Sequence, residues 1–353
     1  MSDMRDEMLR TLDRIVDGTM TTQVRETADR LGSGTAETSD SKSDTATAGL
    51  WSALDEAGFT AIGAGGEDEI AFADCMELIR RAGYHAMPVP LAETIMARRI
   101  LARLGLAAPE GAITIAPPGA GDGIADDAFA SGAVAKAVPY ASMAPHALVA
   151  TGKAVHLLDI SQAVAARDQN MAGEARDVVD LGRAKPVAKA SVADAQKVLE
   201  TEGALARATQ LAGAMSAATD HALIWVSDRI QFGRPIAKHQ AVQHLMAQMA
   251  EETAAAGAAA DLAIAASERE PDRLRVAIAK SRAGEAAGKG ANIAHAVFGA
   301  MGFTREHPLH YATRRLWAWR NEFGSEVYWQ AEIGRTVAAN GGQALWTTLT
   351  RGE

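Results

Sequence analysis

Apolar residues recur at helical spacing through the first third of the chain. One apolar stripe predicts a single amphipathic helix over residues 4–31, followed by a Ser-, Thr- and Asp-rich flexible loop over residues 32–49. The stripe is formed by Met8, Leu9, Leu12, Ile15 and Val16. The same periodicity predicts further helices at residues 50–58, 70–84 and 91–105.

The pattern changes between residues 111 and 186. Apolar residues now come in short runs, such as AITIA, ALVAT and AVHLLDI, which Gly, Pro and Asp separate. Runs of this length bounded by turn residues are typical of strands. A small β domain is therefore predicted in the middle of the chain.

Long helical patterns return towards the C-terminus, and small residues dominate their apolar faces. Small side chains let helix axes approach closely, which favours a tight antiparallel bundle. Gly233 supplies an unusual backbone angle between the first two helices, and Pro235 is expected in the first turn of the second. The predicted helices cover residues 192–227, 236–268, 272–298, 309–320 and 326–339.

These patterns together predict a mainly α protein with a small β domain. Its expected parts are an N-terminal helical domain over residues 1–110, a middle β domain over residues 111–188 and a C-terminal helical bundle over residues 189–353. The sequence has no sustained heptad and no fixed repeat, so neither a coiled coil nor a solenoid is predicted.

Composition narrows the functional classes. A net charge of −9 argues against a nucleic-acid binder. Cys75 is the single cysteine, so a disulfide framework and a thiolate metal cluster are excluded, and a buried thiol is expected. The histidines at 239 and 244, and at 307 and 310, lack metal-site spacing, so no metal is predicted. Without an apolar leader or a run of membrane length, a cytoplasmic protein with no membrane partner is expected.

Two sequence blocks resemble the acyl-CoA dehydrogenase flavoprotein family. The first is R-x-Q-F-G-x-P-I, residues 229–236, followed by H-Q-x-V-Q, and the second is the glycine-containing run at residues 299–304 followed by Glu306 and Pro308. The resemblance covers residues from about 190 to the C-terminus, with thinner matches upstream. It implies the three-part fold predicted above, FAD as cofactor and an acyl-CoA as substrate.

The resemblance also implies cofactor-binding positions. Arg229, Gln231 and Phe232 match residues that reach across family dimers to FAD; the alternative is a helix-end cap with a core phenylalanine. Gly299 and Gly302 belong to the second block, and Ser325 replaces a threonine that can bind the flavin. Two departures weaken the family pattern: alanine stands at 296 and 300, and residues 115–122 lack the usual Thr and Ser.

Dehydrogenation in this family needs a carboxylate base, and two candidates each miss the family position by one residue. Glu322 precedes Phe323, which occupies one base position, and Glu202 precedes Gly203, which occupies the other. A shift of one residue turns a helical side chain by about 100°. The alternative is that Glu202 and Glu322 are ordinary surface carboxylates.

The resemblance and the substituted base lead to one functional hypothesis and two alternatives. The hypothesis is an FAD-dependent subunit that desaturates an acyl-CoA in a hetero-oligomer, where a paralogous dehydrogenase subunit supplies the base and an electron-transfer acceptor completes the cycle. A self-sufficient homo-oligomer using Glu322, and a non-catalytic scaffold, are the alternatives. Bulky acyl groups such as steroid side chains are the substrate class suggested by analogy.

Overall fold

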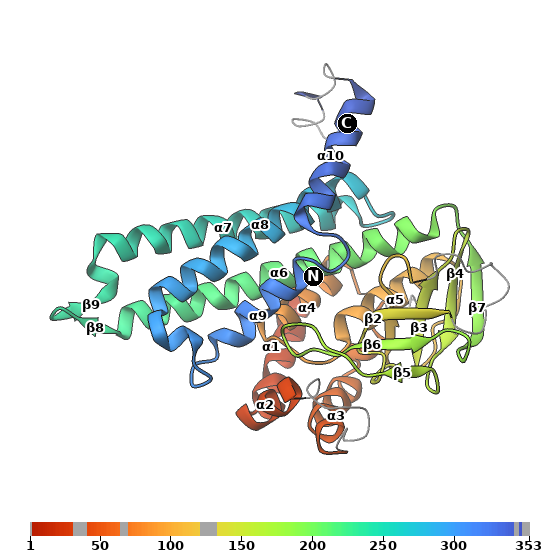
Figure 1. The fold of residues 1–353 in the computed structure, drawn as a ribbon, viewed down its shortest axis with the longest axis horizontal. Coiled ribbons are helices and arrows are strands. Elements are labelled where there is room, and N and C mark those ends of the chain that lie inside the picture. Colours follow the sequence, from red (N-terminus) through yellow and green to blue (C-terminus); the bar gives the residue numbers. More distant parts are fainter. Residues whose placement is uncertain (1, 31–40, 64–69, 121–132, 342–345, 348–353) are drawn as a thin grey trace.

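A computed structural model describes residues 2–30, 41–63, 70–120, 133–341 and 346–347 of the 353-residue chain. Its helices and strands fall into three successive groups along the sequence (Figure 1). Helices come first, short strands follow, and long helices complete the chain, so the prediction of a mainly α protein with a small β domain is confirmed.

The N-terminal helices differ from the expectation in two places. Residues 4–30 form two helices, because the Thr21 hydroxyl accepts a hydrogen bond from the Val24 amide at 3.3 Å and starts a new one. Of the predicted loop, residues 41–49 are helical and bury Thr47 on the same side as Leu50, and residues 32–40 lie outside the described residues. This group consists of α1 (Ser2–Thr19), α2 (Thr22–Arg30), α3 (Ser41–Glu56), the 3₁₀ turn η1 (Phe59–Ala61), α4 (Phe72–Tyr84) and α5 (Leu91–Arg103).

The middle strands form two sheets. One has the order β1-β3-β4-β7, with β1 parallel to β3 and the other neighbours antiparallel, and the second has the antiparallel order β2-β6-β5. A separate apolar core that includes Val138, Leu158 and Val179 joins them. The strands are β1 (Ile113–Ile115), β2 (Val134–Pro139), β3 (His146–Ala150), β4 (Ala154–Asp159), β5 (Val164–Ala166), β6 (Arg176–Asp180) and β7 (Lys185–Ser191).

Three long helices lie side by side in the C-terminal bundle, and a small hairpin stands at the end farthest from the sheets (Figure 1). The final helix projects away from the bundle in the same view. These elements are α6 (Ala195–Asp228), β8 (Ile230–Gln231), β9 (Arg234–Pro235), η2 (Ile236–Lys238), α7 (Gln240–Ala266), α8 (Arg273–Phe298), η3 (Gly299–Phe303), α9 (Leu309–Trp319) and α10 (Glu326–Asn340).

Alanine and glycine faces let α4 and α6 approach backbone to backbone. A Cβ added at Gly213 would overlap the Arg80 carbonyl oxygen, and one added at Gly83 would overlap the Gln210 carbonyl oxygen. Close helix contact therefore requires glycine at these two positions.

No helix within the described ranges is both long and apolar enough to cross a bilayer.

We expect Gly213→Ala to lower the free energy of unfolding by about 2 kcal/mol, because the helices must move apart to admit one methyl group. Urea unfolding followed by circular dichroism measures the change. Gly334→Ala is the matched control: this helical glycine on α10 has no atom near its added Cβ, so alanine should stabilise by up to about 1 kcal/mol. An equal response of the two variants would contradict the packing argument.

Candidate functional site

The two family base positions face each other in the folded chain. Gly203 lies on α6, Phe323 lies in the loop between α9 and α10, and the Phe323 ring occupies the space that a Cβ at Gly203 would need. Phe323 is buried and has a positive φ of 52°. Neither position carries a carboxylate, and an aromatic ring fills the space between them.

Hydrogen bonds hold this loop in place. The Trp329 indole donates to the Phe323 carbonyl at 2.9 Å, and the Lys280 ammonium donates to the carbonyls of Arg320 and Gly324, both at 2.8 Å. Burial lowers the pKa of Lys280 to about 7, against the opposing effect of nearby carboxylates. Hydrogen bonds from Trp329 and Lys280 therefore fix the position of the loop that carries Phe323.

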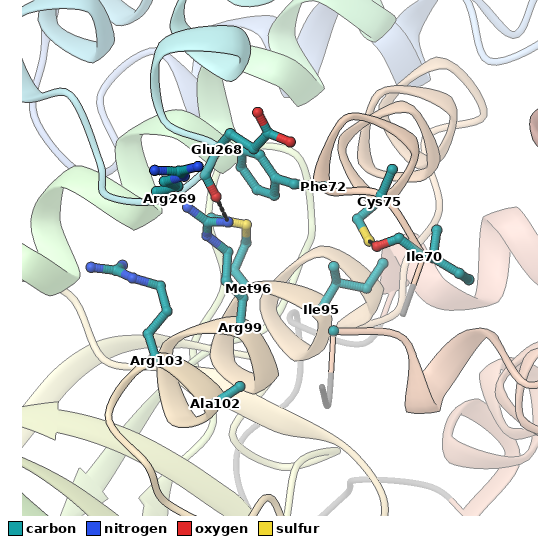
Figure 2. Close-up of a pocket in the computed structure, with 12 residues that line it drawn as sticks. Ile70, Phe72, Cys75, Ile95, Met96, Arg99, Ala102, Arg103, Glu268 and Arg269 are labelled. Atoms are coloured by element: carbon teal, nitrogen blue, oxygen red, sulfur yellow. Dashed lines mark hydrogen bonds between the residues drawn. The ribbon is translucent and has the colours of Figure 1, made fainter. Parts of the chain in front are cut away.

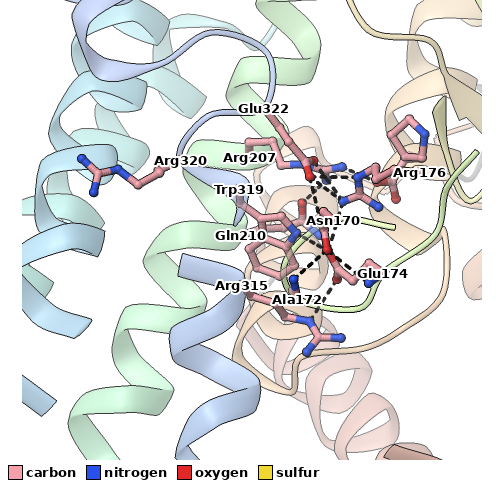
Figure 3. A network of polar contacts seen from close by, with 12 residues as sticks. Asn170, Ala172, Glu174, Arg176, Arg207, Gln210, Arg315, Trp319, Arg320 and Glu322 are labelled. Carbon is pink, nitrogen blue, oxygen red and sulfur yellow. Dashed lines mark hydrogen bonds and ion pairs between the residues drawn. The ribbon is translucent and has the colours of Figure 1, made fainter. Parts of the chain in front are cut away.

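Glu322 is turned away from that contact and lies among cations (Figure 3). Its Oε1 accepts from Asn170 at 3.0 Å and from Arg176 at 2.8 Å, and its Oε2 accepts from Arg176 at 3.0 Å and Arg207 at 2.7 Å. Burial acts to raise the pKa of the Glu322 carboxyl, but Arg176 and Arg207 outweigh it and hold the pKa below its ordinary value. Both oxygens are occupied, which opposes a role as a base.

Glu174 is a second, fully enclosed carboxylate in the same network. Burial acts to raise its pKa, but Arg315 and Arg176 overcome that effect and lower the pKa to about 2. Its five donors come from the β domain and from α9: Tyr140 at 2.9 Å, Asn170 at 3.0 Å, Arg176 at 3.0 Å, Arg315 at 3.0 Å and Trp319 at 2.7 Å. Sequence reasoning did not single out Glu174, and no local motif marks it.

Arg207 links this network to the N-terminal helices. Its guanidinium donates to Glu93 on α5 at 2.7 Å, to Glu322 at 2.7 Å and to the Gln210 side chain. The sequence offers one signal for Arg207, which is that a charged residue interrupts the Ala-rich run of α6. Three guanidinium groups, on Arg176, Arg207 and Arg315, thus meet three carboxylates, on Glu93, Glu174 and Glu322.

Glu202 is also not a surface carboxylate, contrary to the alternative drawn from the sequence. It is 0% exposed and faces α5, where its Oε1 pairs with Arg103 and lies 3.6 Å from Arg99 Nε. Burial raises the pKa of Glu202, although both arginines act to lower it. Glu202 and Glu322 therefore lie in two separate charged clusters.

The first cofactor block forms an exposed hairpin at the end of the bundle. Phe232 and Gly233 have φ values of 51° and 78° and connect β8 to β9, as a two-residue turn with left-handed geometry requires. Pro235 lies in β9 and not in the first turn of α7, because the 3₁₀ turn η2 comes between them. Phe232 is 90% exposed, so the alternative of a core phenylalanine is wrong.

Arg229 and Gln231 are exposed beside Phe232 on this hairpin. The Arg229 guanidinium lies 5.8 Å from the centre of the Trp225 ring. Trp225 in turn stacks on Phe298 at 4.9 Å and donates to the Val297 carbonyl at 3.2 Å. This contact brings the end of α6 next to the end of α8.

Gly299 and Gly302 lie at that same end of the bundle. Gly299 has a φ of 59° and ends α8, while Gly302 is buried against Phe298 and His295. Phe303 stacks on the His295 ring at 4.5 Å and is 76% exposed. The structure therefore brings five of the six predicted cofactor positions to one end of the molecule.

Ser325 is the sixth position and lies apart from them. It caps α10, where its hydroxyl accepts from the Tyr328 amide at 3.4 Å. Within the described residues, no group of three His, Cys, Asp or Glu side chains is arranged to hold a metal ion.

The C-terminal region matches a known family. Residues 193–335 match the family model for the acyl-CoA dehydrogenase C-terminal domain. Glutaryl-CoA dehydrogenase from Desulfococcus multivorans is 42% identical to this chain over 99 residues, which are 28% of this chain and 25% of that relative. The match thus spans a quarter of the relative's length.

Solved structures resemble the whole chain. A chain of the ChsE4–ChsE5 complex from Mycobacterium tuberculosis superposes with a TM-score of 0.81 at 21% identity, covering 95% of this chain and 97% of that chain. The Tcur3481–Tcur3483 steroid ACAD gives a TM-score of 0.77 at 22% identity, covering 97% and 99%. At these identities the likeness shows a shared three-part fold.

The Glu174 carboxylate makes the free energy of unfolding depend on pH. Its folded pKa of about 2 lies below the ordinary value of 4.5, so its contribution is complete above pH 4.5 and is lost as the pH falls towards 2. We expect the stability difference between wild type and Glu174→Gln to narrow by about 2 kcal/mol from pH 6 to pH 3. Urea midpoints across this range measure it, and a constant difference would contradict the assignment.

Removing the Glu322 charge should leave three buried arginines facing only two carboxylates, on Glu93 and Glu174. We expect Glu322→Gln to cost about 3 kcal/mol of unfolding free energy at pH 7. Glu251→Gln, at an exposed position on α7, is the matched control and should change stability by about 0.5 kcal/mol or less. A Glu322→Gln protein as stable as the control would show that the ion pairs contribute nothing net.

Proposed function

Because the chain belongs to the acyl-CoA dehydrogenase family, we propose that it is a subunit of a hetero-oligomeric, FAD-dependent acyl-CoA dehydrogenase. In this proposal the chain completes a flavin site on a paralogous partner and contributes no catalytic base. The observation that carries it is the contact between Phe323 and Gly203, since both base positions are occupied without a carboxylate.

The two nearby carboxylates do not replace the missing base. A base must have a free oxygen aimed at the proton it removes. Both oxygens of Glu322 accept bonds from arginine, and Glu202 is enclosed between α5 and α6 with Arg99 and Arg103. The alternative of a self-sufficient enzyme using Glu322 would require breaking a balanced ion network at each turnover.

The hairpin at residues 229–235 fits one end of FAD. An arginine, an amide and an aromatic ring stand exposed together, which suits a pyrophosphate and an adenine. Arg229 would pair with phosphate oxygens and Phe232 would stack on the base. Their exposure supports donation to a site on another subunit.

The described part of the predicted flavin-facing segment lacks the hydroxyl groups expected there. Residues 115–120 contain no hydroxyl side chain, Gly121 and Asp122 lie outside the described residues, and the Tyr140 hydroxyl is turned inwards to Glu174. The ring would then be held mainly by the partner. Bound there, FAD supplies the hydride acceptor for desaturation of the thioester.

The substrate and the redox partner follow by analogy with the structural neighbours. A steroid ACAD is among them, and an electron-transferring flavoprotein of Acidaminococcus fermentans gives a TM-score of 0.69. We therefore include in the proposal a bulky acyl-CoA, such as a steroid side-chain thioester, and an electron-transfer flavoprotein as acceptor. Both belong to the assembled enzyme and not to this subunit alone.

Flavin stoichiometry tests the proposal. The chain is purified alone and after co-expression with a longer paralogue that carries an intact Tyr-Glu-Gly-Thr segment, and the visible spectrum is recorded. We expect flavin only in the complex, at about half a molecule per chain. One flavin per chain without a partner, bleached by an acyl-CoA, would overturn the proposal. A stable complex without flavin would identify a scaffold.

Two variants separate the roles of the hairpin and of Glu322 in that complex. Phe232→Ala should release flavin several-fold more readily, because a stacked ring contributes about 1–3 kcal/mol. Val187→Ala, another exposed apolar position on β7, should not. In the complex with Glu322→Gln, acyl-CoA should still bleach the bound flavin at temperatures below the unfolding transition. Loss of bleaching with retained flavin would make Glu322 the base and contradict the proposal.

A further inference from the structure

A cavity of about 310 Å³ lies between α4, α5 and the turn that joins α7 to α8 (Figure 2). Its wall combines apolar side chains with cations, the combination expected of a small-molecule pocket. Neither Phe323 nor Gly203 lines it, so it is separate from the occupied base positions. The residues that matter below are Phe72, Cys75, Met96, Arg99, Ala102 and Arg103.

Among the described residues, the mostly buried charges beside this cavity do not balance. Arg99 and Arg103, 11% and 21% exposed, both pair with Glu202, whose side chain is 0% exposed, which leaves one positive charge in excess. Arg269 also lines the cavity, but it is exposed to water. Glu270 also pairs with Arg103, but its side chain is 81% exposed, and water screens such a pair. Glu268 points its carboxylate away from both arginines (Figure 2). A buried excess charge favours binding of a counter-ion.

A free hydrogen-bond donor accompanies the excess charge. Within the described part of the chain, Arg103 Nε has no hydrogen-bond partner, whereas Arg99 Nε faces Glu202 Oε1 at 3.6 Å. Arg99 is held flat against Phe72, with its guanidinium carbon 3.6 Å from the ring centre, and donates to the carbonyl of Glu268 at 3.1 Å. The guanidinium is thus fixed at the wall before any ligand arrives.

We propose that this cavity binds a small monocarboxylate with a short apolar tail. The carboxylate would accept from Arg99 and Arg103, and the tail would lie among Phe72, Cys75 and Met96. A monoanion matches the single excess charge, and the apolar side chains of the wall suit a short hydrocarbon tail. This inference does not depend on the proposed flavin-site function.

Calorimetric titration of the purified full chain with hexanoate tests the site. Hexanamide has the same shape without the charge and should bind about tenfold more weakly, because arginine forms stronger hydrogen bonds to a charged acceptor than to a neutral one. Acetate has the charge without the tail and should also bind more weakly. No binding of hexanoate, or equal affinity for hexanoate and hexanamide, would overturn the proposal.

Three variants locate the ligand. Arg103→Gln leaves Arg99 and Glu202 as a neutral pair, so hexanoate should bind at least about tenfold more weakly while hexanamide is unaffected. Arg183→Gln removes the same charge from an exposed turn of the β domain and should change nothing. Ala102→Trp, at an exposed helix position that lines the cavity, should block binding without unfolding the chain. Wild-type affinity in Ala102→Trp would place the ligand elsewhere.

Cys75 offers an independent readout, because it is the single cysteine and lines the cavity. Bound hexanoate should slow alkylation of Cys75 by the uncharged reagent iodoacetamide several-fold, and hexanamide at the same concentration should slow it less. Unprotected alkylation under saturating hexanoate would also overturn the proposal.

Discussion

The rest of the structure depends on six charges gathered where the β domain meets the helices. Three arginines and three glutamates come from α5, α6, α9, β6 and two loops, and all except the half-buried Glu322 are enclosed. Removing such groups from water costs several kcal/mol each unless every charge is paired and hydrogen-bonded. Here the charges sum to zero. A shift of any one element would leave a charge unmatched, so the network fixes how the elements sit together.

This constraint separates the interior of the chain from its exposed end. Inside, every acceptor oxygen of Glu174 and Glu322 is already used, and the Phe323 ring fills the space beside Gly203. At the far end of the bundle, Phe232 and Phe303 present aromatic rings to solvent, and Arg229 lies on the same hairpin as Phe232. Exposed aromatic groups beside a cation are typical of a binding surface. The groups available to a partner subunit are therefore on the outside, and the ion network inside contributes to stability.

Much of this arrangement was predictable, because periodicity and turn residues act locally. The long helices of the bundle begin and end within a few residues of the predicted positions, and the chain reversal at Gly233 was predicted from its need for a positive φ. Local signals also explain the errors. Thr21 ends one helix pattern and starts another, and Thr47 fills an apolar position on α3 although threonine counts as polar.

The ion network could not be predicted, because its partners are far apart in the sequence. Arg207 and Glu322 are separated by 115 positions, and Arg315 and Glu174 by 141. A hydrophobic pattern predicts that a charged residue is exposed, since burying an unpaired charge is costly. The burial of Glu202 was missed for the same reason: its partners Arg99 and Arg103 belong to a helix about a hundred residues earlier.

The structure explains why both carboxylates lie one residue before the family base positions. Gly203 and Phe323 meet face to face, so the residue before each must point elsewhere, and in both cases it points at two arginines. For either glutamate to act as a base, its backbone would have to rotate and its carboxylate would have to leave two cations in a buried environment. The second requirement is the greater, because it would expose an excess of positive charge to low dielectric. Local loop movement alone therefore cannot turn Glu202 or Glu322 into the missing base.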